Sequence, residues 1–215
     1  MNHLFLNRVL VLVTSAFLCL SSARAETPPS QEMIATWWKA KSKEEVPTLG
    51  DLIEVRLRSK EVAYLIEVAF NRGRYDMFRT VMVRPRLREV REVDEPVATD
   101  IKVYDLDRNG VSEVVAKMIS SGGGTYRGVH VVVQFDEWSP VVLYESEVER
   151  TCEPTDSSPG CSSRDVSWKF VDINGDGTID LLETVTMQET PPKGRTITKK
   201  ETHKLLFRKH DMFVE

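Results

Sequence analysis

Most of the chain alternates between apolar and polar positions in short runs that predict β-strands. Apolar side chains fall on every second residue over 53–57 and again over 62–70. Successive side chains of a strand point to opposite faces of a sheet, so this period of two is typical of half-buried strands. Residues 77–83 have the composition of a returning strand, whereas residues 84–96 are charged and show no clear period.

One stretch near the N-terminus has helical rather than strand spacing. Met33, Ile34, Trp37 and Trp38 fall on one face of a helix, and Ser30 stands where an N-cap is needed. We expect these tryptophans to anchor a core rather than to form a ligand platform.

The second half of the chain contains the same pattern twice: strand, acidic loop, strand, then an apolar strand, a polar turn and another strand. We assign residues 97–150 and 162–215 to these two units. Each has the four strands of a propeller blade, but two units are too few for a closed propeller. The predicted fold is mostly β, an antiparallel meander or sandwich of two blade-like units with N-terminal strands and one short N-terminal helix.

The acidic loops have the spacing of a calcium site. Oxygen-bearing side chains occupy loop positions 1, 3, 5 and 9, position 6 is glycine, and position 7 can offer its backbone carbonyl. Ca²⁺ takes six to eight oxygen ligands, which such a loop wraps around one ion. The candidate ligands are Asp105, Asp107, Asn109, Val111 and Glu113 in the first loop, and Asp172, Asn174, Asp176, Thr178 and Asp180 in the second.

The two loops differ in how well they match this pattern. The second has glycine at both positions 4 and 6, whereas the first has Arg108 at position 4. We therefore expect the second loop to bind calcium more tightly. The alternative for either loop is an acidic Asx-type turn that holds no metal.

Glu183 raises the question of whether the second loop is an EF-hand. It stands at position 12, where an EF-hand supplies a bidentate ligand. An EF-hand needs flanking helices, but Val166, Trp168 and Phe170 alternate with polar residues before the loop, and β-branched residues follow it. We therefore predict strand, loop, strand.

A strand, a loop of the form D-x-[DN]-x-[DN]-G-x-x-[DE] and a second strand resemble the calcium loops of FG-GAP and VCBS-type repeats. Such repeats are known from integrin α-subunit propeller blades and from many bacterial exported proteins. The resemblance covers residues 97–215 and implies calcium binding by the side chains at positions 1, 3, 5 and 9.

The first 25 residues have the organisation of an export signal. Arg8 precedes an apolar run that is too short to span a bilayer, and Ala23 and Ala25 form an A-x-A cleavage site. We predict a periplasmic or secreted protein with no transmembrane segment after cleavage. The remaining chain would comprise a helical segment (26–48), a β region (49–96) and the two calcium-loop units, forming one domain with that β region.

Composition indicates which class of partner is excluded and whether the cysteines are oxidised. The formal net charge is −4, and loss of Arg8 and Arg24 with the signal makes it more acidic, which predicts no nucleic-acid partner. Two cysteines remain, Cys152 and Cys161, and an even pair in an exported protein predicts a disulfide.

Three functions are compatible with these observations. The favoured one is an exported, non-catalytic calcium-binding domain that binds an envelope or extracellular protein or a glycan. The first alternative is a periplasmic inhibitor of a cell-wall hydrolase, similar to lysozyme inhibitors, which would insert the glycine-rich segment 122–128 into an active site. The second is an enzyme of unrecognised type, although the sequence carries no H-E-x-x-H, G-x-S-x-G or P-loop motif.

Overall fold

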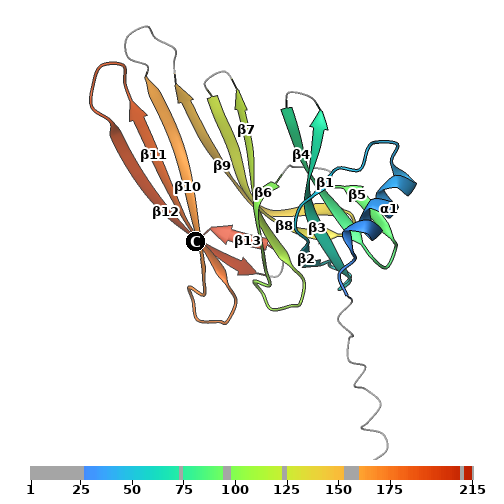
Figure 1. Cartoon of the computed structure of the whole chain (residues 1–215). Coiled ribbons are helices and arrows are strands. Elements are labelled where there is room, and N and C mark those ends of the chain that lie inside the picture. Colours follow the sequence, from blue (N-terminus) through green and yellow to red (C-terminus); the bar gives the residue numbers. More distant parts are fainter. Residues whose placement is uncertain are drawn as a thin grey trace, which may run out of the picture.

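The computed structural model describes residues 27–72, 75–93, 98–122, 125–152, 160–208 and 211–214. In these residues the chain forms one helix and two antiparallel sheets, so the predicted mostly-β class is confirmed (Figure 1). The predicted export signal, residues 1–25, lies outside the described residues.

The N-terminal part is a small sheet with a helix on one face. The helix α1 is N-capped as predicted, since the Met33 amide donates to Ser30 Oγ at 3.3 Å. The sheet order is β1-β3-β4-β5, and β2 also pairs with β3. The elements are α1 (Gln31–Lys41), β1 (Thr48–Leu49), β2 (Ile53–Arg56), β3 (Val62–Arg72), β4 (Tyr75–Arg84) and β5 (Glu89–Glu92).

The remaining strands form one eight-stranded sheet in which every strand pairs with its neighbours in sequence. The unit order predicted from the sequence therefore appears as a continuous meander, with an acidic loop after the first strand of each group of four. The strands are β6 (Ala98–Tyr104), β7 (Glu113–Gly122), β8 (Thr125–Asp136), β9 (Ser139–Cys152), β10 (Cys161–Val171), β11 (Asp180–Thr190), β12 (Ile197–Arg208) and β13 (Asp211–Val214).

Strand alternation distributes the core between the layers. On β3, Tyr64 and Ile66 pack against Ile34 and Trp38 of α1, whereas Leu65 faces the large sheet. The three strand residues are at most 2% exposed, so β3 is buried on both faces. This explains the nearly continuous apolar run of β3, because a strand covered on both faces has no solvated side.

β8 is also buried on both faces, so it lies at the centre of the molecule. Val131 and Val133 face the N-terminal sheet, and Val132 between them faces Leu106 and Phe207 on the other side. The order of layers is thus helix, small sheet and large sheet, with the second half of the large sheet covering the face that carries Val132.

The large sheet folds back over itself without closing, because β9 and β10 pair only near their shared connection. Residues 161–164 of β10 pair with residues 149–152 of β9, and beyond them the two strands separate. Aromatic residues of β10 then pack against residues of β6, β7 and β9. The fold therefore has the local character of a sandwich, although its strands belong to one sheet.

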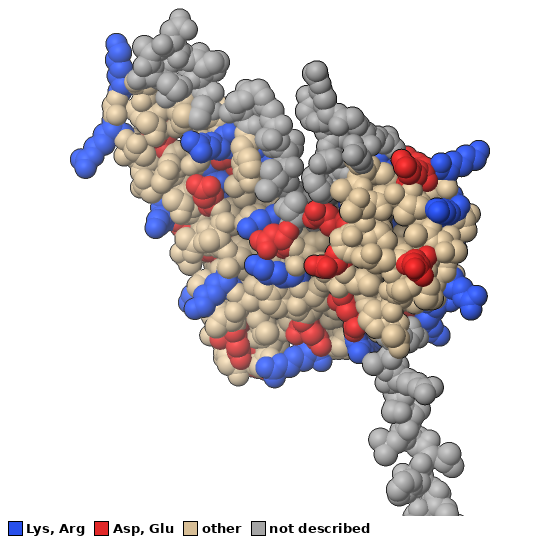
Figure 2. All heavy atoms as spheres, viewed as in Figure 1, with Lys and Arg blue, Asp and Glu red and all other residues tan. Residues whose placement is uncertain are grey.

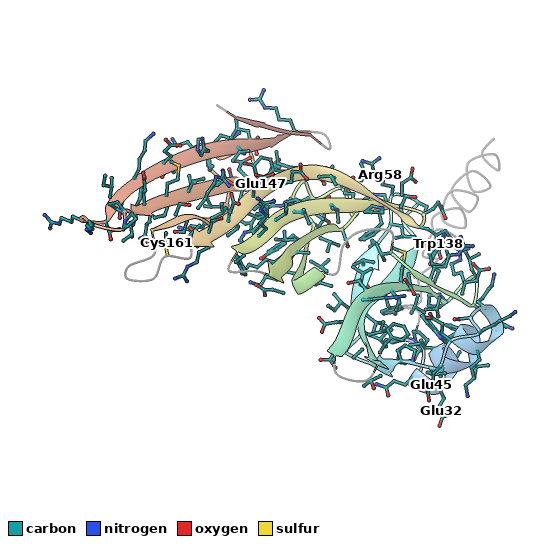
Figure 3. All side chains as sticks on the ribbon, turned by 90° about the horizontal axis from the view of Figure 1, so that it is seen from above. Glu32, Glu45, Arg58, Trp138, Glu147 and Cys161 are labelled. Carbon is teal, nitrogen blue, oxygen red and sulfur yellow. The ribbon has the colours of Figure 1, made fainter. Side chains whose placement is uncertain are left out.

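An ionic cluster joins the small sheet to the tip of the β8–β9 hairpin, at the end opposite Cys161 (Figure 3). Buried Arg84 makes a two-point hydrogen bond with Glu61, at 3.1 and 2.5 Å, and an ion pair with Glu137. Trp138 lies beneath the guanidinium groups of Arg84 and Arg91, at 5.0 and 4.4 Å. Charge-assisted bonds of this type fix the orientation of two packed layers.

Candidate metal centre

The loop between β6 and β7 is folded by its own acidic side chains. Asp105 at position 1 accepts from the amide of Gly110 at 3.1 Å, Asp107 accepts from the amide of Asn109 at 3.1 Å, and Asn109 accepts from the amide of Val111 at 2.6 Å. The last two bonds are Asx-type turns, in which a short polar side chain replaces a backbone acceptor, and the first closes the loop over five residues. The loop is therefore ordered by the residues that the sequence assigned as ligands.

The loop between β10 and β11 repeats this framework position by position. Asp172 accepts from the amide of Gly177 at 2.9 Å, Asn174 from the amide of Asp176 at 2.9 Å, and Asp176 from the amide of Thr178 at 2.7 Å. The last of these bonds is the main cause of the lowered pKa of the Asp176 carboxyl.

Backbone conformation also matches between the loops. Gly110 and Gly177, both at position 6, have φ values of 75° and 87°, in the left-handed region that favours glycine. Position 4 is left-handed as well, with φ 77° at Gly175 and 56° at Arg108. The first loop thus keeps the required conformation although a non-glycine residue there is strained.

The carboxylates at position 9 have the same role in both loops. Glu113 Oε2 accepts from the amide of Leu106 at 2.6 Å, and Asp180 Oδ2 accepts from the amide of Ile173 at 2.9 Å; both donors stand at position 2. Both carboxylates are fully buried. Each is also tied to a neighbouring strand, Glu113 by Gln134 on β8 and Asp180 by the amide of Phe207 on β12.

The two loops lie against each other. The amide of Ile179, at position 8 of the second loop, donates to the carbonyl of Leu106 in the first loop at 2.7 Å. Leu106 is completely buried, and Ile179 packs against the core cluster that contains it. The loops therefore form one paired structure at a single end of the large sheet.

The first loop also contacts the N-terminal sheet. Arg56 and Ser112 exchange two hydrogen bonds, from the Arg56 amide to Ser112 Oγ at 2.8 Å and from the Ser112 amide to the Arg56 carbonyl at 2.9 Å. The Lys60 ammonium donates to the carbonyl of Asn109. A rearrangement of this loop would therefore disturb the contact between the two sheets.

A buried polar chain continues from the loop into the protein. Gln134 donates to Glu113 Oε1 at 2.5 Å and accepts from Arg58 Nε at 3.0 Å. Gln134 and Glu113 are both 0% exposed. Burial raises the pKa of the Glu113 carboxyl to about 7, although the bonds from Gln134 and Leu106 oppose the shift, and the nearby charges of Asp107 and Asp105 add to it.

The carboxylates converge in the first loop. Asp105, Asp107 and Glu113 each offer an oxygen within 4.8 Å of the other two, and among the described residues no other group of three or more His, Cys, Asp or Glu side chains meets this condition. With Asn109 Oδ1 and the Val111 carbonyl these oxygens fit the hard oxygen ligand set that Ca²⁺ prefers. Glycine content favours the second loop and this convergence favours the first, so the order of the two affinities stays a prediction.

The second loop has the same turns but a different distribution of charge. Its position 3 is Asn174 rather than a carboxylate, and its acids at positions 1, 5 and 9 do not converge as those of the first loop do. Glu183 does not complete the set, because it lies on β11 opposite Trp168 and accepts from the Trp168 indole at 3.0 Å. The flanks of both loops are strands, as predicted, rather than the helices of an EF-hand.

The predicted disulfide lies far from this pair of loops along the strands. Cys161 is disulfide-bonded, and Cys152 is the residue opposite it in the pairing of β9 with β10. The bond therefore spans the connection between the two groups of four strands.

No protein-family model matches the chain, and neither a curated protein sequence nor a solved structure shows significant similarity to it. The helix in the described residues is too short and too polar to cross a membrane.

Proposed function

We propose that the chain is a non-catalytic β-domain of an exported protein, which binds Ca²⁺ in its paired loops and uses the surface they stabilise to bind a protein or a glycan. The observation that carries this proposal is the common hydrogen-bond framework of the two loops, with three carboxylates gathered in the first. Acidic groups this close repel one another unless a cation or a proton offsets their charge.

The position-9 carboxylates favour ion binding over catalysis. A carboxyl with a pKa near 7 suits general acid–base chemistry. Glu113 is completely buried and held by two hydrogen bonds, so a substrate has no route to it. A bound cation, in contrast, would offset the cost of placing this charge in the interior.

Two further observations support the remaining parts of the proposal. The disulfide of Cys161 suits the oxidising compartments that an export signal leads to. On the face in Figure 2, Lys and Arg side chains lie among Asp and Glu over the described residues. Mixed charge of this type suits a protein or glycan partner better than a polyanion.

Thermal unfolding of the mature chain with calcium, with magnesium and with chelator tests the proposal. At ten times the dissociation constant, calcium adds roughly 1.4 kcal/mol per site. For a domain of this size that stabilisation raises the melting temperature by about 3–6 °C. Asp107→Ala should reduce the rise and Asp51→Ala, an exposed control outside the loops, should retain it; an unchanged melting temperature for the wild type contradicts the proposal.

A further inference from the structure

An aromatic cleft opens where β10 crosses β6, β7 and β8. It encloses about 270 Å³, close to the lower end of ligand pockets, which span roughly 300–1,000 Å³. We define the aromatic cleft by four rings and a charged rim. The rings, on β6, β8 and β10, are those of Tyr104, His130, Trp168 and Phe170. The rim, on β6 and β7, is formed by Asp100, Lys102 and Lys117. It is separate from the metal centre, but Tyr104 directly precedes the first ligand, Asp105.

The rings are fixed by one another rather than free to rotate. Tyr104 and Phe170 have centroids 4.8 Å apart, and His130 meets Trp168 edge-on at 5.2 Å. All four side chains are half-buried, so each keeps part of its surface open to the cleft. The indole of Trp168 is further held by its hydrogen bond to Glu183. A pre-oriented aromatic surface loses little entropy when a ligand is bound.

The rim of the cleft carries both positively and negatively charged side chains. An irregularity in the register of β6 places Asp100 at φ 57°, between Lys117 at 3.1 Å and Lys102 at 3.5 Å. Bulges of this type often re-aim a side chain beside a binding site. These three groups leave one net positive charge. Burial and the nearby Lys117 lower the pKa of His130, so its neutral imidazole can both donate and accept.

We propose that the aromatic cleft binds one pyranose ring that bears a carboxylate, as in an acidic saccharide. The ring's apolar face would lie on the aromatic side chains, its hydroxyl groups would bond to Asp100 and His130, and its carboxylate would pair with Lys102. This inference rests on the glycan-binding part of the proposed function and names its ligand class. It does not require that the loops hold calcium.

Calorimetric titration with trigalacturonate, and with maltotriose as the neutral probe, tests the assignment. Lys102→Met should weaken trigalacturonate binding about two- to fivefold, the value of one exposed ion pair. Phe170→Leu keeps an apolar side chain in the cleft and should weaken trigalacturonate binding about three- to tenfold, through loss of an aromatic contact. Lys39→Met on α1 changes the net charge equally and should have no effect, and circular dichroism should show that all three variants are folded.

Two results would overturn the assignment: no heat with millimolar trigalacturonate, or equal affinity for maltotriose. Unchanged affinity in both Lys102→Met and Phe170→Leu would also overturn it, since the saccharide would then bind elsewhere. Running each titration with calcium and with chelator separates the proposals. Saccharide binding without calcium binding supports the saccharide site and contradicts only the proposed calcium site. Calcium binding without saccharide binding contradicts only the saccharide site.

Discussion

The amide of Ile179 donates a 2.7 Å hydrogen bond to the carbonyl of Leu106, and this bond joins the two acidic loops. The donor stands at position 8 of the second loop and the acceptor at position 2 of the first. Because Leu106 also donates its own amide to Glu113, the bond connects the second loop to the carboxylate group of the first. An ion bound in the first loop would therefore restrict both loops.

Amide hydrogen exchange can detect this coupling. In calcium, Asp107→Ala should accelerate exchange of the Ile179 amide, although the substitution lies in the other loop, because the acceptor at Leu106 loses its fixed position. The amide of Ile66, in the centre of the small sheet, serves as the internal control and should not change. Exchange at Ile179 that is identical in wild type and variant would show that the loops act independently.

Calcium binding should depend on pH through Glu113. Its folded pKa of about 7 is above the ordinary value of 4.5, so below pH 7 the carboxyl binds a proton that calcium must displace. The affinity of the first loop should then fall about tenfold for each pH unit between 7 and 5. Calorimetry at pH 8, 7 and 6 measures this, and an affinity independent of pH would mean that Glu113 is not a ligand.

The same shift predicts how stability changes with pH without calcium. The folded state binds more protons than the unfolded state between pH 4.5 and 7, so the free energy of unfolding should fall as pH rises through this interval and level off above it. Denaturant titrations in chelator test the direction. Calcium should therefore stabilise the protein more at pH 8 than at pH 5.5.

Gln134 should be important for both stability and metal binding. Gln134→Leu removes the donor to Glu113 Oε1 and the acceptor for Arg58 Nε, and leaving buried polar groups unpaired costs about 1–3 kcal/mol each. The variant should also raise the Glu113 pKa further and weaken calcium binding. Gln188→Leu, at an exposed position on β11, is the matched control. Equal stability of the two variants would contradict a structural role for the buried chain.

Much of the geometry of the two acidic loops could be predicted from the sequence, because Asx turns are local. A side chain at position 3 reaches the amide at position 5 whatever surrounds it, so the spacing alone defined both frameworks. The helix cap at Ser30 and the alternation of β3 were predictable for the same reason. Each depends on residues close together in the chain.

Long-range partners could not be predicted in this way. Gln134 and Phe207 hold the position-9 carboxylates from strands more than twenty residues away in sequence, and the aromatic cleft combines β6, β8 and β10. The convergence of three carboxylates in the first loop could not be predicted from spacing either, since glycine content favours the second loop. Which loop binds calcium more tightly stays a prediction.

The disulfide should stabilise the fold without affecting the candidate metal centre. Cys152→Ser with Cys161→Ser should lower the free energy of unfolding by roughly 2–3 kcal/mol, since the closed loop is short. Calcium affinity should be unchanged, because no ligand lies between the cysteines. Thermal melts and calcium titration of the double variant measure both quantities. A loss of calcium binding would mean that the connection between β9 and β10 supports the loops.

The most direct test of calcium binding is calorimetric titration of calcium into the chain from residue 26 onward and into its Asp107→Ala and Asp176→Ala variants. Exported modules bind calcium at about 10⁻⁴–10⁻³ M. We expect heat in this range for the wild type, loss of the tighter step in Asp107→Ala and loss of only a weaker step in Asp176→Ala. A wild-type chain that gives no heat with millimolar calcium would contradict the central claim.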